Sequence, residues 1–198
     1  MIPNNLQEHH LRVAALAEII LENWTGSEMD KVSIIQACTL HDIAKPITFD
    51  LAKQAQFGMS PEDIDRLEKH QIRLKSQYGE DEHHCTVKIC EEIGLSPTAV
   101  KLVDNLEWKY IPRILQESDI SSLIPIYCDM RIGPKGILPL NTRLEKLKNR
   151  TSSDEYEENV RNGNTVEQLI QEKTSINLNS ITESQLEARF DQLLSLEI

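Results

Sequence analysis

The residues best suited to chemistry are a histidine and an aspartate side by side, His41 and Asp42, at the end of an apolar segment. Residues 32–40 are largely apolar, which predicts a buried helix. Pro46 disfavours helical backbone at the residue before it, so the pair lies near the end of that helix. Consecutive helical side chains point about 100° apart, so both can reach one point only between helices. Imidazole and carboxylate together suit a divalent cation, and the pair therefore predicts a metal site between helices.

Two other apolar segments supply further candidate ligands. His10 falls on the same helical face as Val13 and Ala17, so it is expected to point inward. The neighbouring His9 is expected to face solvent. Far downstream, Asp129 lies within a second largely apolar segment. The chain therefore has the order His, His-Asp, Asp, with each member on a different predicted helix.

This constellation resembles the HD superfamily of metal-dependent phosphohydrolases, over roughly residues 6–150. The resemblance rests on three segments, His10-Leu-Arg-Val-Ala, Leu40-His41-Asp42-Ile43-Ala44-Lys45 and Tyr127-Cys128-Asp129-Met130-Arg131. It implies an all-α helical bundle with a metal in a central cleft. The implied cofactor is one divalent transition metal (Mn, Fe, Co, Ni or Zn, with Mg as an alternative). The implied metal ligands are His10, His41, Asp42 and Asp129.

Many HD proteins have two further histidines between the His-Asp pair and the last aspartate, and these complete a two-metal site. His84 resembles the first of them, but no histidine stands at 102–105, where the second is expected. The resemblance therefore favours a single metal, with His84 lining the cleft. An exposed histidine after an acidic turn is the alternative for His84. His70 is expected at the surface.

The resemblance also suggests catalytic roles for three side chains. A bound metal would lower the pKa of its water, and Asp42 or Asp129 could accept the proton of that water. Lys45 could contact a substrate phosphate or steady Asp42, or it could only offset the dipole at the helix C-terminus. The predicted catalytic residues are Asp42, Lys45 and His84.

The basic residues near Asp129 are candidates for binding phosphate. Arg131, Lys135 and Arg143 form a basic concentration there, and arginine can bind a phosphate through two hydrogen bonds. Arg143 is expected on a solvated face instead. The predicted phosphate ligands are therefore Lys45, Arg131 and Lys135.

Length and composition limit the class of protein. With 198 residues the chain fits one domain with a C-terminal extension, and it can bury a sizeable core without disulfides. Its net charge of −11 argues against binding of duplex nucleic acid, which needs a basic surface. Four cysteines without a CxxC pair are expected to be reduced and structural. No targeting or membrane-spanning segment is visible, so a cytoplasmic protein without a membrane partner is expected.

Nearly every long segment has a helical pattern, and no segment alternates convincingly as a strand would. An HD-type domain is expected over residues 1–150, with a helical extension over 151–198 packing on it. Residues 151–165 remain open between a loop and an extension of a neighbouring helix. The predicted helices cover residues 5–24, 27–45, 50–58, 60–78, 83–92, 96–108, a segment around Asp129 ended by Gly133-Pro134, 142–150, 165–174 and 182–196.

The leading functional hypothesis is metal-dependent hydrolysis of a small phosphate ester, and by resemblance a nucleotide. The alternative is an HD module that binds a nucleotide or a protein partner without turnover. A di-iron oxygenase would need more histidines than the sequence offers. An apolar stripe near the C-terminus indicates core packing or a contact between copies in a homo-oligomer. It consists of Leu186, Phe190, Leu193 and Leu194.

Overall fold

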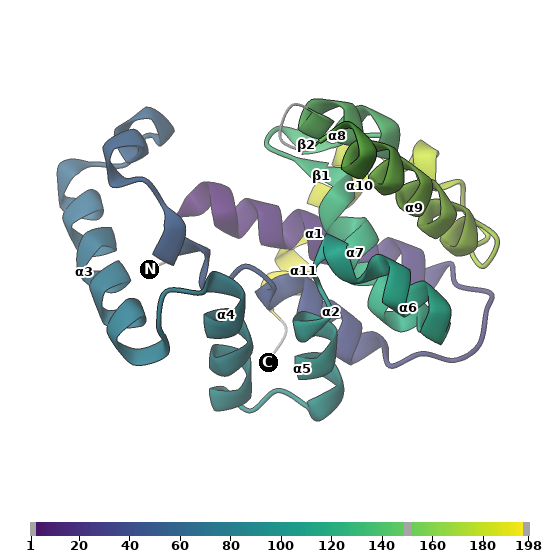
Figure 1. Cartoon of the computed structure of the whole chain (residues 1–198), viewed down its shortest axis with the longest axis horizontal. Helices are drawn as coiled ribbons and strands as arrows, with labels where there is room; N and C mark the ends of the chain where they lie inside the picture. Colours follow the sequence, from purple (N-terminus) through teal and green to yellow (C-terminus); the bar gives the residue numbers. More distant parts are fainter. Residues whose placement is uncertain (1–2, 149–151, 196–198) are drawn as a thin grey trace.

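The structure is a computed structural model, and it describes residues 3–148 and 152–195 (Figure 1). The described residues form an all-α fold, as predicted. The helices are α1 (Asn4–Glu22), α2 (Lys31–Leu40), α3 (Pro61–Tyr78), α4 (Glu82–Glu92), α5 (Pro97–Asp104), α6 (Ile111–Glu117), α7 (Ile120–Arg131), α8 (Leu140–Leu147), α9 (Ser153–Gln171), α10 (Glu183–Glu187) and α11 (Phe190–Leu194). Shorter elements are the 3₁₀ helices η1 (Lys45–Thr48), η2 (Leu51–Phe57), η3 (Trp108–Tyr110) and η5 (Leu178–Ser180), and the strands β1 (Ile132–Gly133) and β2 (Gly136–Ile137).

Helices α1, α2 and α7 form the centre of the molecule. Each of the three packs against the other two, and α2 and α7 both also contact α5. The middle of α1 is buried around nearly its full circumference, and its alanines at 14, 15 and 17 are completely inaccessible. Small side chains allow neighbouring helices to approach closely, so α1 can lie inside the bundle rather than on its surface. Its first turns reach the region where α2 ends.

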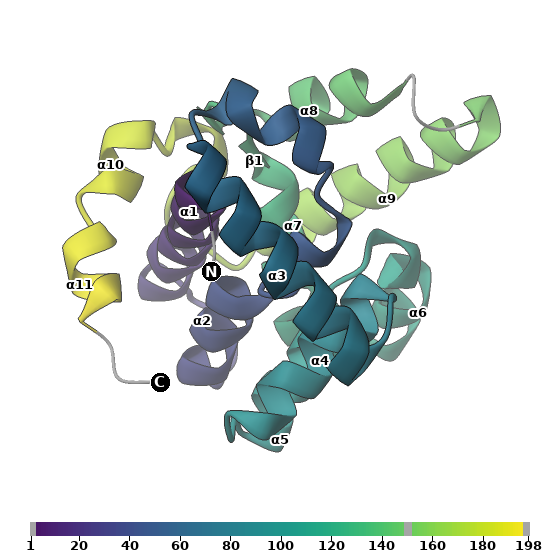
Figure 2. The ribbon, with the colours of Figure 1, turned by 90° about the vertical axis from the view of Figure 1, so that its left-hand side faces the viewer.

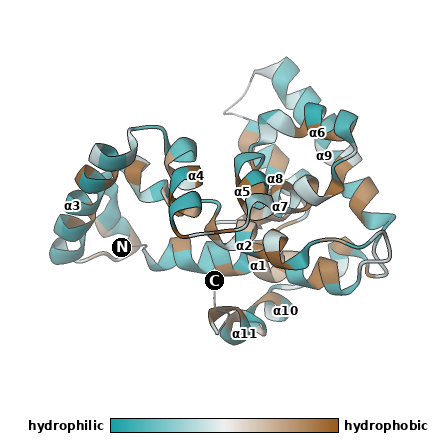
Figure 3. Ribbon diagram, turned by 90° about the horizontal axis from the view of Figure 1, so that it is seen from below, coloured by the Kyte–Doolittle hydropathy of each residue, from teal (hydrophilic) through white to brown (hydrophobic). Residues whose placement is uncertain are grey.

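A second, smaller core lies away from this centre. It consists of Ala44 and Ile47 from the segment that follows α2, Leu74 from α3, and Cys85 from α4. Helix α3 lies at one end of the molecule (Figures 1 and 2), and its residues are predominantly hydrophilic (Figure 3). Gln71 of α3 donates from Nε2 to two main-chain carbonyl oxygens, of Pro46 at 2.7 Å and of Phe49 at 2.8 Å. These bonds attach η1 to α3.

The C-terminal helices pack on the central bundle through apolar side chains of the main core and through one buried arginine. Helix α9 contacts α7 and α8, whereas α10 and α11 contact α1. Arg131 at the end of α7 is only 2% exposed, and its guanidinium donates to the Tyr127 hydroxyl and to the carbonyl oxygens of Leu138 and Leu178. The carboxylate of Glu167 on α9 lies 3.4 Å from it. One arginine therefore joins α7 to the β-hairpin, α9 and η5.

Helix α2 is shorter than predicted at both ends. It starts at Lys31, because Asp30 caps it by accepting from the Ser33 amide at 3.0 Å, whereas a start near residue 27 was expected. It ends at Leu40. The His41 ring nitrogen Nδ1 lies 2.9 Å from the Cys38 carbonyl oxygen, the acceptor that a continuing helix would use for its own amide. Tighter turns follow, and the His-Asp pair therefore lies just beyond α2.

Other boundaries differ for local reasons. Helix α7 continues through Pro125, a residue that usually interrupts a helix, because the side chains on both sides of it are buried in the core. The helix predicted over 96–108 ends at Asp104, since Glu107 is extended. No strand was predicted, yet the β-hairpin follows α7. A glycine permits its turn: Gly136 has a φ of +115°, and a Cβ there would collide with the carboxylate of Glu183.

The C-terminal predictions are confirmed in part. The described part of 151–165 is helical and joins the predicted helix from 165 in one long α9. The helix predicted over 182–196 begins with a capping box of Thr182 and Gln185, but within the described residues it divides into α10 and α11. Leu186 and Leu193 are buried, whereas Leu194 is 70% exposed. The predicted end of α8 at residue 150 lies outside the described residues.

The Arg131 contacts predict a large loss of stability in Arg131→Met. The substitution leaves two carbonyl groups without their donor and leaves the Glu167 carboxylate with the Tyr127 hydroxyl alone, so it should lower the free energy of unfolding by about 3 to 5 kcal/mol. Urea denaturation followed by circular dichroism measures the change. The matched control is Arg66→Met on α3, which breaks an exposed pair with Asp63 and should cost less than about 1 kcal/mol. Equal losses in the two variants would contradict this role of Arg131.

Candidate metal centre

The His-Asp pair lies where the ends of three elements meet. His41 directly follows α2, and its Nδ1 faces the Cys38 carbonyl oxygen. A carbonyl oxygen only accepts, so Nδ1 carries a hydrogen and neutral His41 presents the lone pair of Nε2 to the cleft. One oxygen of Asp42 lies 3.9 Å from that Nε2. Such a hydrogen bond behind a histidine is the usual way in which proteins fix the tautomer of a metal ligand.

His9 completes this group, rather than His10. Its Nε2 lies 3.3 Å from Nε2 of His41 and 3.0 Å from Oδ1 of Asp129, which is itself 3.5 Å from Nε2 of His41. Ligand atoms of His9, His41 and Asp42 all lie within 4.8 Å of one another, and in the described part of the chain they are the group able to hold a metal ion. The expectation that His9 faces solvent is therefore wrong.

His10 is buried beside the group but does not reach the same contacts. It is 6% exposed, its ring centroid lies 5.3 Å from that of His41, and its Nε2 has no hydrogen-bond partner. Burial, with the charges of His41 and His9, lowers the pKa of His10 to about 2, so the ring is neutral. The apolar face of α1 correctly predicts that His10 is buried. A metal cleft must admit solvent, however, so His9, at the edge of that apolar face, was the better candidate.

The charges of the site are strongly coupled. Burial lowers the pKa of His41, but the hydrogen bond and charge of Asp129 outweigh it and raise the pKa to about 9. Burial also raises the pKa of Asp129, whereas its hydrogen bonds with His41 and His9 lower it well below the usual range for aspartate. Without a metal, the site is therefore an imidazolium beside a carboxylate.

These residues open into a cleft of about 420 Å³. Its lining consists of His41, Asp42, Lys45, Asp81, Glu82, His83, Leu106, Glu107 and Asp129. Five of these side chains are carboxylates and one is a lysine. Lys45 lies with Nζ 3.0 Å from Oε1 of Glu82 and 3.6 Å from Oδ1 of Asp42. Burial lowers the pKa of Lys45, but the charges of Asp42 and Glu82 raise it by more, so the ammonium stays charged.

The chain was compared with known families, curated proteins and solved structures. A family model described as HD domain matches residues 6–108, which is just over half of the chain. The chain belongs to the HD domain family. No curated protein and no solved structure matches it. The HD superfamily consists in general of metal-dependent phosphohydrolases, and the matched region includes His9, His41 and Asp42, while Asp129 lies beyond it.

Of the adjacent pair His83 and His84, it is His83 that lines the cleft beside His41 and Asp42, which is called the HD cleft below. His84 is exposed, as in the alternative considered for it, whereas Nε2 of His83 lies 3.0 Å from the carbonyl oxygen of Asp104. Asp104 lies in the segment 102–105, where a further histidine was expected, and its Oδ1 lies 3.7 Å from Nε2 of His83. Oε2 of Glu107 lies 3.9 Å from the same nitrogen. Two adjacent histidines at a helix start cannot be ranked by periodicity, because neither has an apolar turn before it.

The predicted basic residues around Asp129 do not line the HD cleft. Arg131 points to the opposite side of α7 and is buried among its structural partners, so its assignment to substrate phosphate is wrong. Lys135 is exposed in the turn of the β-hairpin, and Arg143 lies on α8. Lys45 is the candidate phosphate ligand that does line the cleft.

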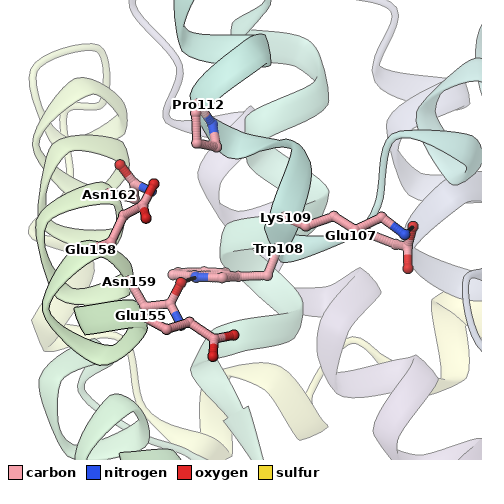
Figure 4. A pocket seen from close by; sticks show the side chains of 8 residues that line it. All are labelled: Glu107, Trp108, Lys109, Pro112, Glu155, Glu158, Asn159 and Asn162. Carbon is pink, nitrogen blue, oxygen red and sulfur yellow. Dashed lines mark hydrogen bonds and ion pairs between the residues drawn. The ribbon is translucent and has the colours of Figure 1, made fainter. Parts of the chain in front are cut away.

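A second cavity, of about 450 Å³, lies between η3 and α9 (Figure 4). The Trp108 indole donates from Nε1 to Oδ1 of Asn159 at 2.6 Å and lies along one wall. Glu107 borders both cavities. The lining contains carboxylates but neither histidine nor cysteine, so this cavity lacks the imidazole donors that the cleft beside His41 offers. The HD cleft is therefore the candidate site.

Other sequence expectations can be compared with the structure. All four cysteines are free and buried, as expected. In the described part of the chain every helix is too short or too polar to cross a lipid bilayer. His70 is half-buried on α3, at a distance along the chain from the cleft residues.

The coupling of His41 to Asp129 predicts a pH-dependent stability of the metal-free protein. His41 titrates near 6.5 when unfolded and near 9 when folded. Its contribution to stability is therefore fully present below pH 6.5 and is lost as the pH rises through 9. Urea denaturation of chelator-treated protein across that interval should show a falling free energy of unfolding. Asp129→Asn should flatten the slope, and His84→Gln should retain it; an unchanged slope in Asp129→Asn would contradict this coupling.

Proposed function

We propose that the chain is a metal-dependent phosphohydrolase that cleaves a small phosphate ester, with a nucleotide as the preferred substrate class. The observation that supports it most is the convergence of His9, His41, Asp42 and Asp129 beside a cleft that Lys45 also lines. Two imidazoles and two carboxylates suit one divalent ion of Mn, Fe, Co, Ni or Zn, and leave positions for water and substrate.

The donor set fits such an ion. Nε2 of His9 and Nε2 of His41 lie 3.3 Å apart, with Oδ1 of Asp129 at 3.0 Å from His9 and one oxygen of Asp42 at 3.9 Å from His41, so two imidazoles and two carboxylates lie close enough together to share one ion. When bound, the metal would supply an activated water and polarise the phosphoryl oxygen. The unpartnered Nε2 of His10 lies beside the same group, so His10 remains a predicted ligand that an experiment must test.

The remaining roles belong to side chains of the cleft. Asp42 has one oxygen toward His41 and the other toward Lys45, so it can accept a proton while it stays oriented. The Lys45 ammonium, 39% exposed, can offset charge on a phosphate oxygen. The imidazole of His83 also lines the cleft and is a further candidate to contact the substrate.

Metal binding should depend on His9 more than on His10. In His9→Ala the affinity for Mn²⁺, measured by calorimetry on chelator-treated protein, should fall at least about ten-fold, since even outer-shell changes cost that much. His10→Leu replaces a buried imidazole with an apolar side chain of similar size, and this variant should bind Mn²⁺ as the wild type does. The reverse ranking would return the ligand role to His10.

Hydrolysis should require the metal and Asp42. With Mn²⁺, the wild type should release phosphate from p-nitrophenyl phosphate or a nucleoside monophosphate, and Asp42→Asn should lose at least about 100-fold in kcat. Circular dichroism checks that the variant is folded. If no phosphate ester is hydrolysed with any of these metals while a nucleotide binds tightly, the non-catalytic HD module is the correct function instead.

A further inference from the structure

The hydrogen bonds around Lys45 point to a residue that the proposed chemistry does not use. Oε1 of Glu82, in the first turn of α4, lies 3.0 Å from Nζ of Lys45. Its other oxygen, Oε2, accepts from the Thr48 hydroxyl at 3.1 Å, and that hydroxyl also reaches the Lys45 carbonyl oxygen at 3.1 Å. Both oxygens of Glu82 are thus engaged by η1, one by each end of that 3₁₀ helix.

Lys45 has a second carboxylate within reach. Asp42 lies one turn before it, with Oδ1 at 3.6 Å from Nζ, which is beyond hydrogen-bond distance. The other oxygen of Asp42 faces Nε2 of His41. Lys45 is therefore held 0.6 Å nearer to Glu82 than to Asp42 (3.6 minus 3.0 Å), although both carboxylates carry the same charge.

The two positions of the ammonium have different consequences. A lysine side chain is a flexible four-carbon stem with a compact charge, so without a fixed partner it moves to the nearest carboxylate. If Nζ bonded Asp42 directly, it would neutralise a carboxylate that the proposed metal site needs, and it would turn away from substrate. Metal ligands must be deprotonated and free to bind, so competition by a neighbouring ammonium weakens the site.

We propose that Glu82 is a positioning residue that holds Lys45 away from Asp42 and so keeps the metal site competent. The inference rests on the proposed function, because it assumes that Asp42 binds the metal. Glu82 acts through Lys45 and does not touch the metal, and Thr48 fixes Glu82 in turn. The role is specific to this carboxylate: Asp81, its neighbour, caps α4 through the His84 amide instead.

The test is a double-mutant cycle read as Mn²⁺ affinity, without any measurement of activity. Glu82→Gln should weaken Mn²⁺ binding about ten-fold, because Lys45 then moves onto Asp42. In the Lys45→Met background the same substitution should cost less than about three-fold, the residual effect of removing a nearby, screened charge. The matched control is Glu91→Gln, which removes a carboxylate paired with Lys88 on the outer side of α4 and should leave the affinity unchanged.

An equal loss of affinity in both backgrounds would overturn the proposal, since it would mean that Glu82 acts by charge or fold alone. No loss in Glu82→Gln would overturn it as well. Thr48→Val is the second variant, for the case that Glu82→Gln does not fold. Thr48→Val should show a smaller loss of Mn²⁺ affinity than Glu82→Gln, and the loss should again depend on Lys45. An equal loss in the wild-type and Lys45→Met backgrounds would contradict the proposal here too.

The coupling between Glu82 and Lys45 and the hydrolysis of a phosphate ester can be tested independently of each other. If the coupling is found but no phosphate ester is hydrolysed, the positioning role stands and the catalytic proposal fails. If hydrolysis is found without coupling, the catalytic proposal stands and Glu82 has no such role. If the wild type does not bind Mn²⁺, both proposals fall.

Discussion

The buried guanidinium of Arg131 is the constraint on which the rest of the structure depends. A charge of this size is tolerated inside a protein only if its donors are satisfied, and Arg131 finds its acceptors on the β-hairpin, α9 and η5 as well as on α7. These acceptors must therefore assemble around the end of α7. Asp129 lies two residues earlier, on the other side of the same helix end. The C-terminal third of the chain thus fixes the position of a residue in the cleft without entering it.

The site that results is acidic in a protein that is itself acidic, with a net charge of −11. Five carboxylates line the cleft against one lysine, so a phosphate approaching it without cations would be repelled. A divalent ion changes this balance at the place where the charges are densest. The electrostatics of the cleft therefore agree with a function that depends strictly on metal, and they disfavour a large polyanion as substrate.

The sequence was sufficient to predict the all-α fold and the proximity of His41, Asp42 and Asp129, because apolar helical patterns and a rare polar pair within them are local signals. The sequence was not sufficient to choose between the adjacent histidines His9 and His10. Periodicity identifies which histidine is buried, and this is His10, but a cleft lies at the margin of a buried face, and there His9 lies. Arg131 was misassigned because a sequence gives charge and proximity along the chain but not direction. The end of α2 depended on a side chain, His41, bonding the main chain.

The two hydrophobic cores have a further consequence for how the molecule opens. The proposed metal ligands are supported by the large core, whereas Lys45 and Glu82 lie on η1 and α4, next to the small core of Ala44, Ile47, Leu74 and Cys85. A core of four residues buries little apolar surface, so this part of the chain is the one to unfold locally while the bundle stays intact. In hydrogen exchange, α3 and η1 would then lose protection before α1 and α7. The proposed metal ligands would then stay in place while Lys45 and Glu82, on η1 and α4, fold and unfold in a separate equilibrium of lower stability.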